Sequence, residues 1–150
     1  MADEKDKSKL TGFYRAKVID NVDPKKTGRV KVWVPEHDYQ TVKDNEGTWA
    51  YPFTIFSASN LEAKDGGVKD FGALHIPPVD SFVGVFYEGG DPSKPRYFGG
   101  FILEGAIPTE NQDGGQYWNK HTITKTPKKR TILMSDDPDD ECVIIRGKKR

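Results

Sequence analysis

The feature that most constrains this chain is a pair of alternating segments joined by a short polar turn near the N-terminus. Residues 13–19 and residues 29–34 each alternate apolar and polar side chains, and Pro35 ends the second run. Because successive side chains of a strand point to opposite faces, a period of two is typical of half-buried strands. The intervening residues 20–28, DNVDPKKTG, are rich in turn-forming Asp, Asn, Pro and Gly. The sequence therefore predicts an antiparallel hairpin.

Three further segments have strand character, namely residues 48–56, 81–87 and 96–102. Pro52 interrupts the first of them, which favours an edge position or a bulge because proline cannot donate a ladder hydrogen bond. The second is apolar on both faces and should be central in its sheet. No segment has convincing helical periodicity, so we predict an all-β domain, a small antiparallel barrel or sandwich.

A β-rich tail is predicted after a Gly-rich linker at residues 104–118. Residues 119–150 contain three short extended segments, 121–126, 130–135 and 142–146. Three short strands bury too little apolar surface to be stable alone, so the tail must fold back on the barrel or find partners in other chains. We therefore predict oligomer contacts at the large apolar residues of this tail: Ile123, Ile132, Leu133, Met134, Val143, Ile144 and Ile145.

The charge distribution argues against nucleic acid as a partner. The chain carries 23 basic and 23 acidic residues, a formal charge of zero, whereas nucleic-acid binders usually carry a positive excess that neutralises phosphates. Residues 119–150 hold nine Lys or Arg and five Asp or Glu, which leaves +4 on the tail and −4 on residues 1–118. This division is compatible with contacts between subunits.

No residue pattern indicates catalysis or a metal site, and we expect no enzymatic activity and no cofactor. The acidic run at residues 136–141 lacks the Gly-centred loop of an EF-hand, and a solvated turn is the favoured interpretation. Three histidines lie singly along the chain and Cys142 is the one cysteine, interpreted as a buried structural thiol. There is no G-x-S-x-G elbow or phosphate-binding glycine loop. Residues 1–11 are predicted to be a flexible, charged tail and not a signal peptide.

Three motifs resemble a known family when they are read in order. Residues 14–32 are similar to the pattern A-x-V-x-x-N-x-D-P-x-x-x-G-R-V-x-V, which opens the baseplate spike oligosaccharide/oligonucleotide-binding (OB) domain of contractile phages and of the valine-glycine-repeat spikes of type VI secretion. Residues 71–96 resemble the family's second stretch, with Asp80-Ser81 in place of its Gly-Asp. Residues 124–145 are loosely similar to the segment that leads into a trimeric shaft. The turns of these motifs are formed by Asn21, Asp23, Pro24, Gly28, Asp91, Pro92 and Pro95.

The resemblance implies an all-β fold in which a five-stranded OB-like barrel over residues 12–103 precedes an extended β tail, residues 119–150, that assembles in a trimer. It implies a structural component of a contractile phage tail baseplate, the central spike that connects the hub to a membrane-piercing tip. The expected partners are two further copies of the chain, the hub protein above and a tip or shaft protein below. The expected location is the virion tail, after synthesis in the host cytoplasm, and the host envelope is contacted only during injection.

Two alternatives remain open from the sequence. One is a single-stranded nucleic-acid-binding module that would use an aromatic and basic face of the first hairpin, formed by Arg15, Lys17, Arg29, Lys31 and Trp33. The other is the spike of a type VI or extracellular contractile injection system. Some phage relatives also carry a lysozyme domain, to which nothing here corresponds. Either the shaft and tip belong to another protein, or the chain is a fragment.

Overall fold

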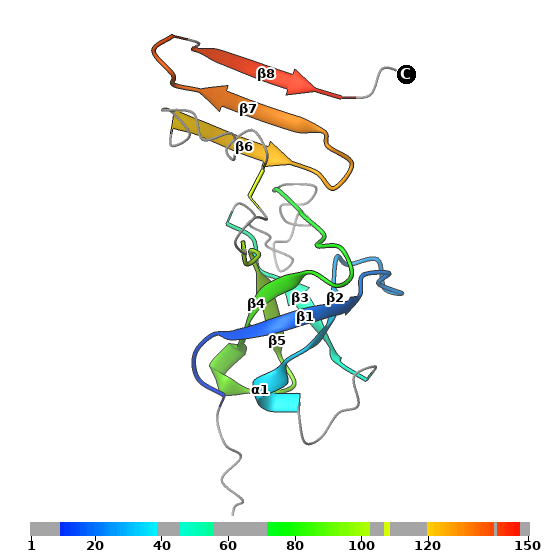
Figure 1. Cartoon of the computed structure of the whole chain (residues 1–150). Coiled ribbons are helices and arrows are strands. Elements are labelled where there is room, and N and C mark those ends of the chain that lie inside the picture. The colour runs from blue at the N-terminus through cyan, green and yellow to red at the C-terminus, as the bar shows by residue number, and fades with distance from the viewer. Residues whose placement is uncertain are drawn as a thin grey trace, which may run out of the picture. The chain divides into compact units, whose positions relative to one another are not determined.

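The computed structural model describes residues 10–38, 46–55, 72–102, 107–108, 120–139 and 141–147. The chain divides into two compact units, Met1–Phe101 and Ile102–Arg150. Figure 1 shows the strands of both units. In the first unit the strands are β1 (Tyr14–Asp20), β2 (Val30–Trp33), β3 (Thr48–Pro52), β4 (Phe82–Tyr87) and β5 (Pro95–Phe98). Two short helical segments accompany them, α1 (Pro35–Asp38) and the 3-10 turn η1 (Glu88–Gly90).

The five strands close into a barrel in the order β1-β2-β3-β5-β4, with β4 returning to β1. All neighbours are antiparallel except β3 and β5, which run parallel through the pairs Tyr51↔Arg96 and Pro52↔Tyr97. The β1–β2 register shifts between Val18 and Asp20, the signature of a β-bulge, which increases local twist and helps a short strand to bend around a barrel. The closed ladder leaves no free sheet edge in this unit.

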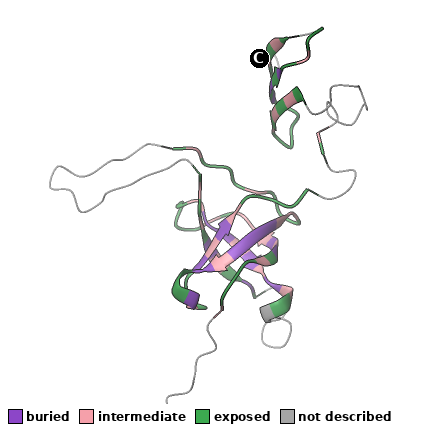
Figure 2. Ribbon diagram, turned by 90° about the vertical axis from the view of Figure 1, so that its left-hand side faces the viewer, coloured by how far each residue is buried: buried purple, intermediate pink, exposed green. Residues whose placement is uncertain are grey.

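Valine dominates the barrel core because inward positions alternate along each strand. Figure 2 shows the buried residues on the barrel strands. Val18, Val30, Val32, Val34, Val83 and Val85 are all at most 1% exposed, and small Ala16 and Ala50 fill the spaces between them. β-branched side chains lose little rotamer freedom on a pleated strand and pack well across a narrow barrel. The larger Tyr87 and Tyr97 extend this core.

The predicted all-β fold and the five-stranded barrel are confirmed, with three corrections. The third strand ends at Pro52 and not at residue 56, and the fifth spans Pro95–Phe98 and not residues 96–102. The edge interpretation of Pro52 was wrong, because β3 lies between β2 and β5. Proline is tolerated there because it is the last residue of the strand, where the ladder passes to Phe53, whose backbone N–H donates to the Tyr97 carbonyl at 2.8 Å.

The second unit is a three-stranded antiparallel sheet, with β6 (His121–Lys125), β7 (Thr131–Ser135) and β8 (Cys142–Arg146) in that order. The β6–β7 pairing runs from His121↔Ser135 to Lys125↔Thr131, and the β7–β8 pairing ends at Thr131↔Arg146. The predicted strands of the tail are therefore present as a meander within one chain. Within the described ranges, no helix of either unit is long and apolar enough to cross a membrane. The predicted flexible tail lies almost entirely, and the linker largely, outside the described residues.

Gly47 offers a test of the barrel packing. A Cβ atom at this position would lie 2.2 Å from the backbone oxygen of Val32 and 2.8 Å from Ile19 Cδ1, so a backbone would have to move. We expect Gly47→Ala to lower the free energy of unfolding of the barrel by about 1–3 kcal/mol, as overpacking does. Thermal unfolding followed by circular dichroism measures the change.

The matched control is Gly100→Ala, since a Cβ there would meet only the Phe82 oxygen at 3.6 Å, an ordinary contact. An unchanged melting temperature for Gly47→Ala would contradict the close approach of the two segments.

Candidate functional site

The β1–β2 turn is organised by one carboxylate, that of Asp23. Its oxygens accept hydrogen bonds from the backbone N–H groups of Lys25 (2.9 Å) and Thr27 (2.7 Å) and from the Thr27 hydroxyl (2.8 Å). The Arg29 guanidinium donates to Asp23 Oδ1 from Nη2 at 2.7 Å and from Nε at 3.1 Å. The two side chains are only 9% and 5% exposed for Arg29 and Asp23, respectively. Asp23 is therefore the centre of the turn and not simply a turn-forming residue.

Arg29 extends this turn onto the next strand through aromatic contacts. Its guanidinium carbon lies 5.2 Å from the ring centre of Trp49 and 5.4 Å from that of Tyr51. A second guanidinium, that of Arg96 on β5, lies 5.2 Å from the Tyr51 ring and donates to the Glu88 carboxylate at 2.6 Å. Cations are attracted to aromatic faces, so the side chains form a continuous ladder across β2, β3 and β5.

The electrostatics of this cluster shift two pKa values in opposite directions. The hydrogen bonds from Arg29 hold the pKa of the Asp23 carboxyl far below its ordinary value, against the opposing effect of burial, and those from Thr27 and Lys25 add to the lowering. The hydrogen bond to Asp23 raises the pKa of Arg29. The pair is thus firmly ionised at neutral pH.

The other turn residues of the motifs also make defined contacts. Asn21 donates from Nδ2 to the Pro77 carbonyl at 3.0 Å, which ties the first turn to the segment before β4. Gly28 has a φ of +81°, a conformation that favours glycine, and its carbonyl accepts a 2.8 Å hydrogen bond from the Tyr97 hydroxyl. Burial raises the pKa of Tyr97 to about 12, so this donor stays protonated at neutral pH. Pro24 occupies the first turn beside Asp23.

Asp91 plays the equivalent part in the turn between β4 and β5. Its Oδ1 accepts from the backbone N–H of Ser93 at 2.9 Å and from the Ser93 hydroxyl at 2.7 Å. These bonds lower the pKa of the Asp91 carboxyl. Pro92 is exposed in the turn, while Pro95 is buried and starts β5 opposite Tyr87. The motif residues therefore shape two turns of the barrel.

The basic face considered for single-stranded nucleic acid is largely engaged within the barrel. The Arg15 guanidinium lies 5.3 Å from the ring centre of Phe82, and Lys17 Nζ lies 2.8 Å from an Asp80 oxygen. Arg29, expected to point outward, is instead 8% exposed as a residue and paired with Asp23. Trp33 is half-buried, and among the described residues its Nε1 has no hydrogen-bond partner. An electrostatic groove for phosphates needs cations that point into it, so these contacts argue against that alternative.

A cluster of four phenylalanines on the barrel surface was missed at the sequence level. The ring centres of Phe13 and Phe98 are 5.1 Å apart, those of Phe53 and Phe86 are 5.3 Å apart, and Phe86 and Phe98 lie 6.1 Å apart. Phe13 is 76% exposed and Phe53 56% exposed. The Phe98 ring lies over Gly84, where a Cβ atom would be 2.5 Å from it. The rings come from segments far apart in the chain, so no local sequence pattern predicts the cluster.

A groove of about 560 Å³ adjoins this phenylalanine cluster. Phe53 and Phe98 line it together with Tyr97, His75 and Pro77, among others. Exposed aromatic side chains are more frequent at protein–protein interfaces than on the rest of a protein surface. Nothing in the described part of the groove places catalytic groups together.

The second candidate surface is one face of the β6-β7-β8 sheet, which we call the apolar sheet face. Its members on β7 and β8 are paired across the strands as Ile132↔Ile145 and Met134↔Val143. They are 49%, 77%, 46% and 69% exposed, respectively. Thr122 and Thr124 complete the face on β6, opposite Met134 and Ile132. Four large apolar side chains thus form a contiguous exposed patch.

The sequence-predicted contact residues do not all lie on this face. Ile123, Leu133 and Ile144 point to the opposite side, where Leu133 is only 7% exposed. Cys142 lies on that side too and is half-buried. His121 begins β6, and its Nδ1 has no hydrogen-bond partner among the described residues. Of the predicted set, only Ile132, Met134, Val143 and Ile145 are positioned to meet a partner through the apolar sheet face.

Comparison with known families identifies the barrel. A family model described as the type VI secretion system/phage-baseplate injector OB domain matches residues 14–101. The match covers more than half of the chain and spans all five strands of the barrel. No curated protein matches the chain. In the described ranges, no group of three or more His, Cys, Asp or Glu side chains could hold a metal ion.

The depressed pKa of Asp23 predicts how barrel stability responds to acid. A carboxyl whose pKa is lower in the folded than in the unfolded chain stabilises the fold at every pH above its ordinary pKa, near 3.8. That stabilisation is lost as the pH falls from this value towards the lower pKa of the folded state. We expect the melting temperature of the barrel to fall steeply below about pH 4. Asp23→Asn should lower it at pH 7 and flatten this acid dependence.

Asp20→Asn is the matched control, since Asp20 lies at the end of β1 and accepts the Val22 backbone N–H at 2.8 Å. If Asp23→Asn kept the acid profile of the parent chain, the Asp23–Arg29 pair would not be the source of that stability.

Proposed function

Because the chain belongs to the family of type VI secretion system and phage-baseplate injector OB domains, we propose that it is the central spike protein of a contractile phage tail baseplate. The family match over the whole barrel carries this proposal. In it the barrel seats the protein beneath the tail tube, and the C-terminal sheet connects to the membrane-piercing tip. The role is mechanical, and no enzymatic activity is proposed.

The proposed assembly is a homotrimer held together by the apolar sheet face. Ile132, Met134, Val143 and Ile145 expose apolar surface that a three-stranded sheet cannot bury alone. Burial of such surface stabilises an assembly by about 25 cal/mol per Å². The sheet also has two unpaired edge strands, β6 and β8, which symmetric assembly would cover. A trimer would therefore cover both the exposed apolar face and the open edges of this sheet.

The neighbours proposed above and below the chain are the hub protein and a tip or shaft protein. The phenylalanine cluster supports a protein contact on the barrel, because Phe13 and Phe53 are more than half exposed. The family description covers type VI secretion as well as phage baseplates, so that system is the second candidate.

Purified phage particles test the location directly. Cross-linking mass spectrometry of intact tails is expected to find the chain in the baseplate, with the barrel joined to the hub and the C-terminal sheet joined to the tip. Non-contractile particles from the same preparation serve as the control. Absence of the chain from intact tails, together with its appearance in type VI secretion fractions, would contradict the phage assignment.

The trimer interface is tested by placing a charge on the apolar sheet face. We expect the purified chain to have three times the 16.9 kDa mass of one protomer by light scattering. Ile145→Asp should reduce this to the mass of one protomer, since an unpaired carboxylate cannot be buried at an apolar contact. The barrel should keep its melting temperature.

Val22→Asp is the matched control, because Val22 in the β1–β2 turn is 77% exposed, as is Ile145. A trimer that survives Ile145→Asp unchanged would show that the apolar sheet face is not the interface.

A further inference from the structure

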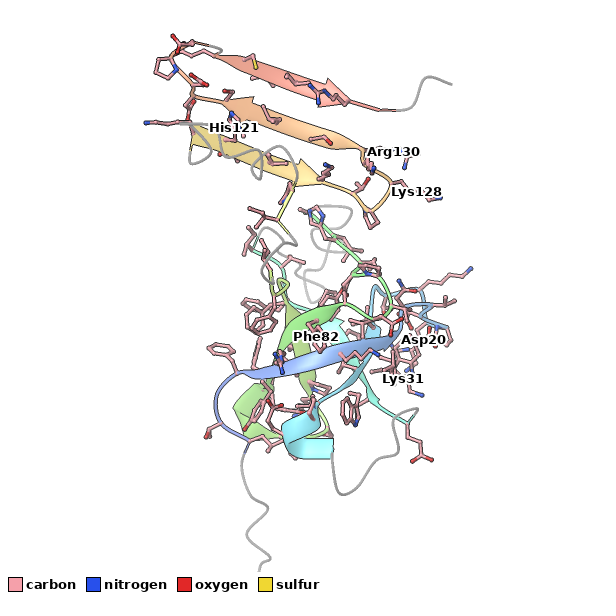
Figure 3. All side chains as sticks on the ribbon, viewed as in Figure 1. Asp20, Lys31, Phe82, His121, Lys128 and Arg130 are labelled. Carbon is pink, nitrogen blue, oxygen red and sulfur yellow. The ribbon has the colours of Figure 1, made fainter. Side chains whose placement is uncertain are left out.

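The two ends of the β6-β7-β8 sheet carry opposite charge. At one end lie five basic residues, on the β6–β7 turn and on the strand positions paired beside it, here called the basic end: Lys125, Lys128, Lys129, Arg130 and Arg146. At the other end lie four acidic residues of the β7–β8 turn, here called the acidic end: Asp136, Asp137, Asp139 and Glu141. Lys120 also lies at this end, where its carbonyl accepts the Asp136 backbone N–H at 3.0 Å, so the described charge of this end remains net negative. Figure 3 shows Lys128 and Arg130 at the end of the sheet opposite His121.

Most of the charged residues at the two ends are exposed, including Asp136, Asp139 and Glu141 at the acidic end. Lys128, Arg130 and Arg146 are exposed, and none forms an ion pair with a described residue. Strands of five residues separate the two turns by about 16 Å, because each residue advances the strand by about 3.3 Å. This separation is about twice the Debye length of about 8 Å at physiological ionic strength. The charges therefore act on whatever approaches each end.

A cyclic trimer requires such a pair of unlike surfaces. Each interface of a threefold ring is heterologous, which means that one patch of a chain meets a different patch of the next chain. The basic and acidic ends of the sheet are two patches of this kind, and they flank the apolar sheet face on the same unit. Opposite charges fix the register and direction of an interface more than they add to its affinity.

We propose that in the assembled trimer the basic end of each sheet lies against the acidic end of the next chain around the ring. The inference rests on the proposed trimer and adds to it the residues that determine its register. The occupant of both ends is a second copy of this chain. Like charges would meet in a reversed arrangement, so the same pairing would also reject chains packed in the wrong direction.

A charge swap tests this pairing. Two half variants reverse the charge of one end each. Lys128→Glu with Arg130→Glu and Arg146→Glu takes the basic end from +5 to −1, and Asp136→Lys with Asp139→Lys and Glu141→Lys takes the four acidic residues from −4 to +2. A swap variant carries all six changes and keeps the net charge of the parent chain. Lys129, whose φ is +60°, and Asp137, which accepts the backbone N–H of Asp139 at 3.0 Å, are left intact to preserve the two turns. The readout is the concentration of half-dissociation by light scattering or analytical ultracentrifugation.

Each half variant is expected to raise the concentration of half-dissociation by about tenfold or more, because like charges meet at all three interfaces. The swap variant should restore the parent value, and 1 M salt should move the half variants back towards it by screening the repulsion. Salt rescue separates repulsion from misfolding. Arg15→Glu with Lys25→Glu and Lys94→Glu, at three exposed barrel positions, makes the same change in net charge as the basic-end half variant and should leave the trimer unchanged.

Half variants that assemble as tightly as the parent chain would overturn the pairing while the trimer stands. A swap variant as weak as the half variants would overturn it too. A parent chain that stays monomeric at every concentration would instead overturn the proposed trimer, and the pairing with it.

Discussion

The barrel depends on the ionised carboxylate of Asp23. A buried guanidinium is costly unless it is paired, and Asp23 Oδ1 accepts hydrogen bonds from both Nε and Nη2 of Arg29. Arg29 can therefore lie against Trp49 and Tyr51 with its charge satisfied. These contacts join the first turn to β3, and Arg96 on the other side of Tyr51 joins β3 to β5, which it meets through only two registered residue pairs. The turn motif thus contributes to barrel closure as well as to the hairpin.

The strands and turns, which depend on the local sequence, could be predicted. The contacts that form only when the barrel closes could not. A period of two identified β1 and β2, apolar and aromatic content identified the other three barrel strands, and the Asp-Pro and Gly signals identified the turns. The inward fold of Arg29 was not foreseen, since its place in the alternation is an outward one. The role of Pro52 was misjudged because parallel pairing with Tyr97 joins residues distant in sequence and leaves no local signal. The phenylalanine cluster was missed for the same reason.

In the tail, by contrast, the alternation of side chains already distinguishes the two faces of the sheet, and the prediction did not make this distinction. Its seven apolar residues were treated as one contact set, yet neighbouring residues of a strand point to opposite faces. Parity alone separates Ile132 and Met134 from Leu133, and the antiparallel register then adds Val143 and Ile145. The residues of the apolar sheet face could therefore be predicted from the sequence. The meander order likewise predicts that the basic β6–β7 turn and the acidic β7–β8 turn lie at opposite ends of the sheet.

The two units solve the problem of sheet edges in opposite ways. The barrel pairs every strand with two neighbours and buries a valine core. The C-terminal sheet keeps two open edges, an exposed apolar face and opposite charges at its ends. Stability gained only by association depends on protein concentration, whereas that of a closed barrel does not. In the proposed trimer, a closed barrel is joined to a sheet whose exposed apolar face and edges are available for contacts with other copies, so that folding and assembly would be governed by separate surfaces.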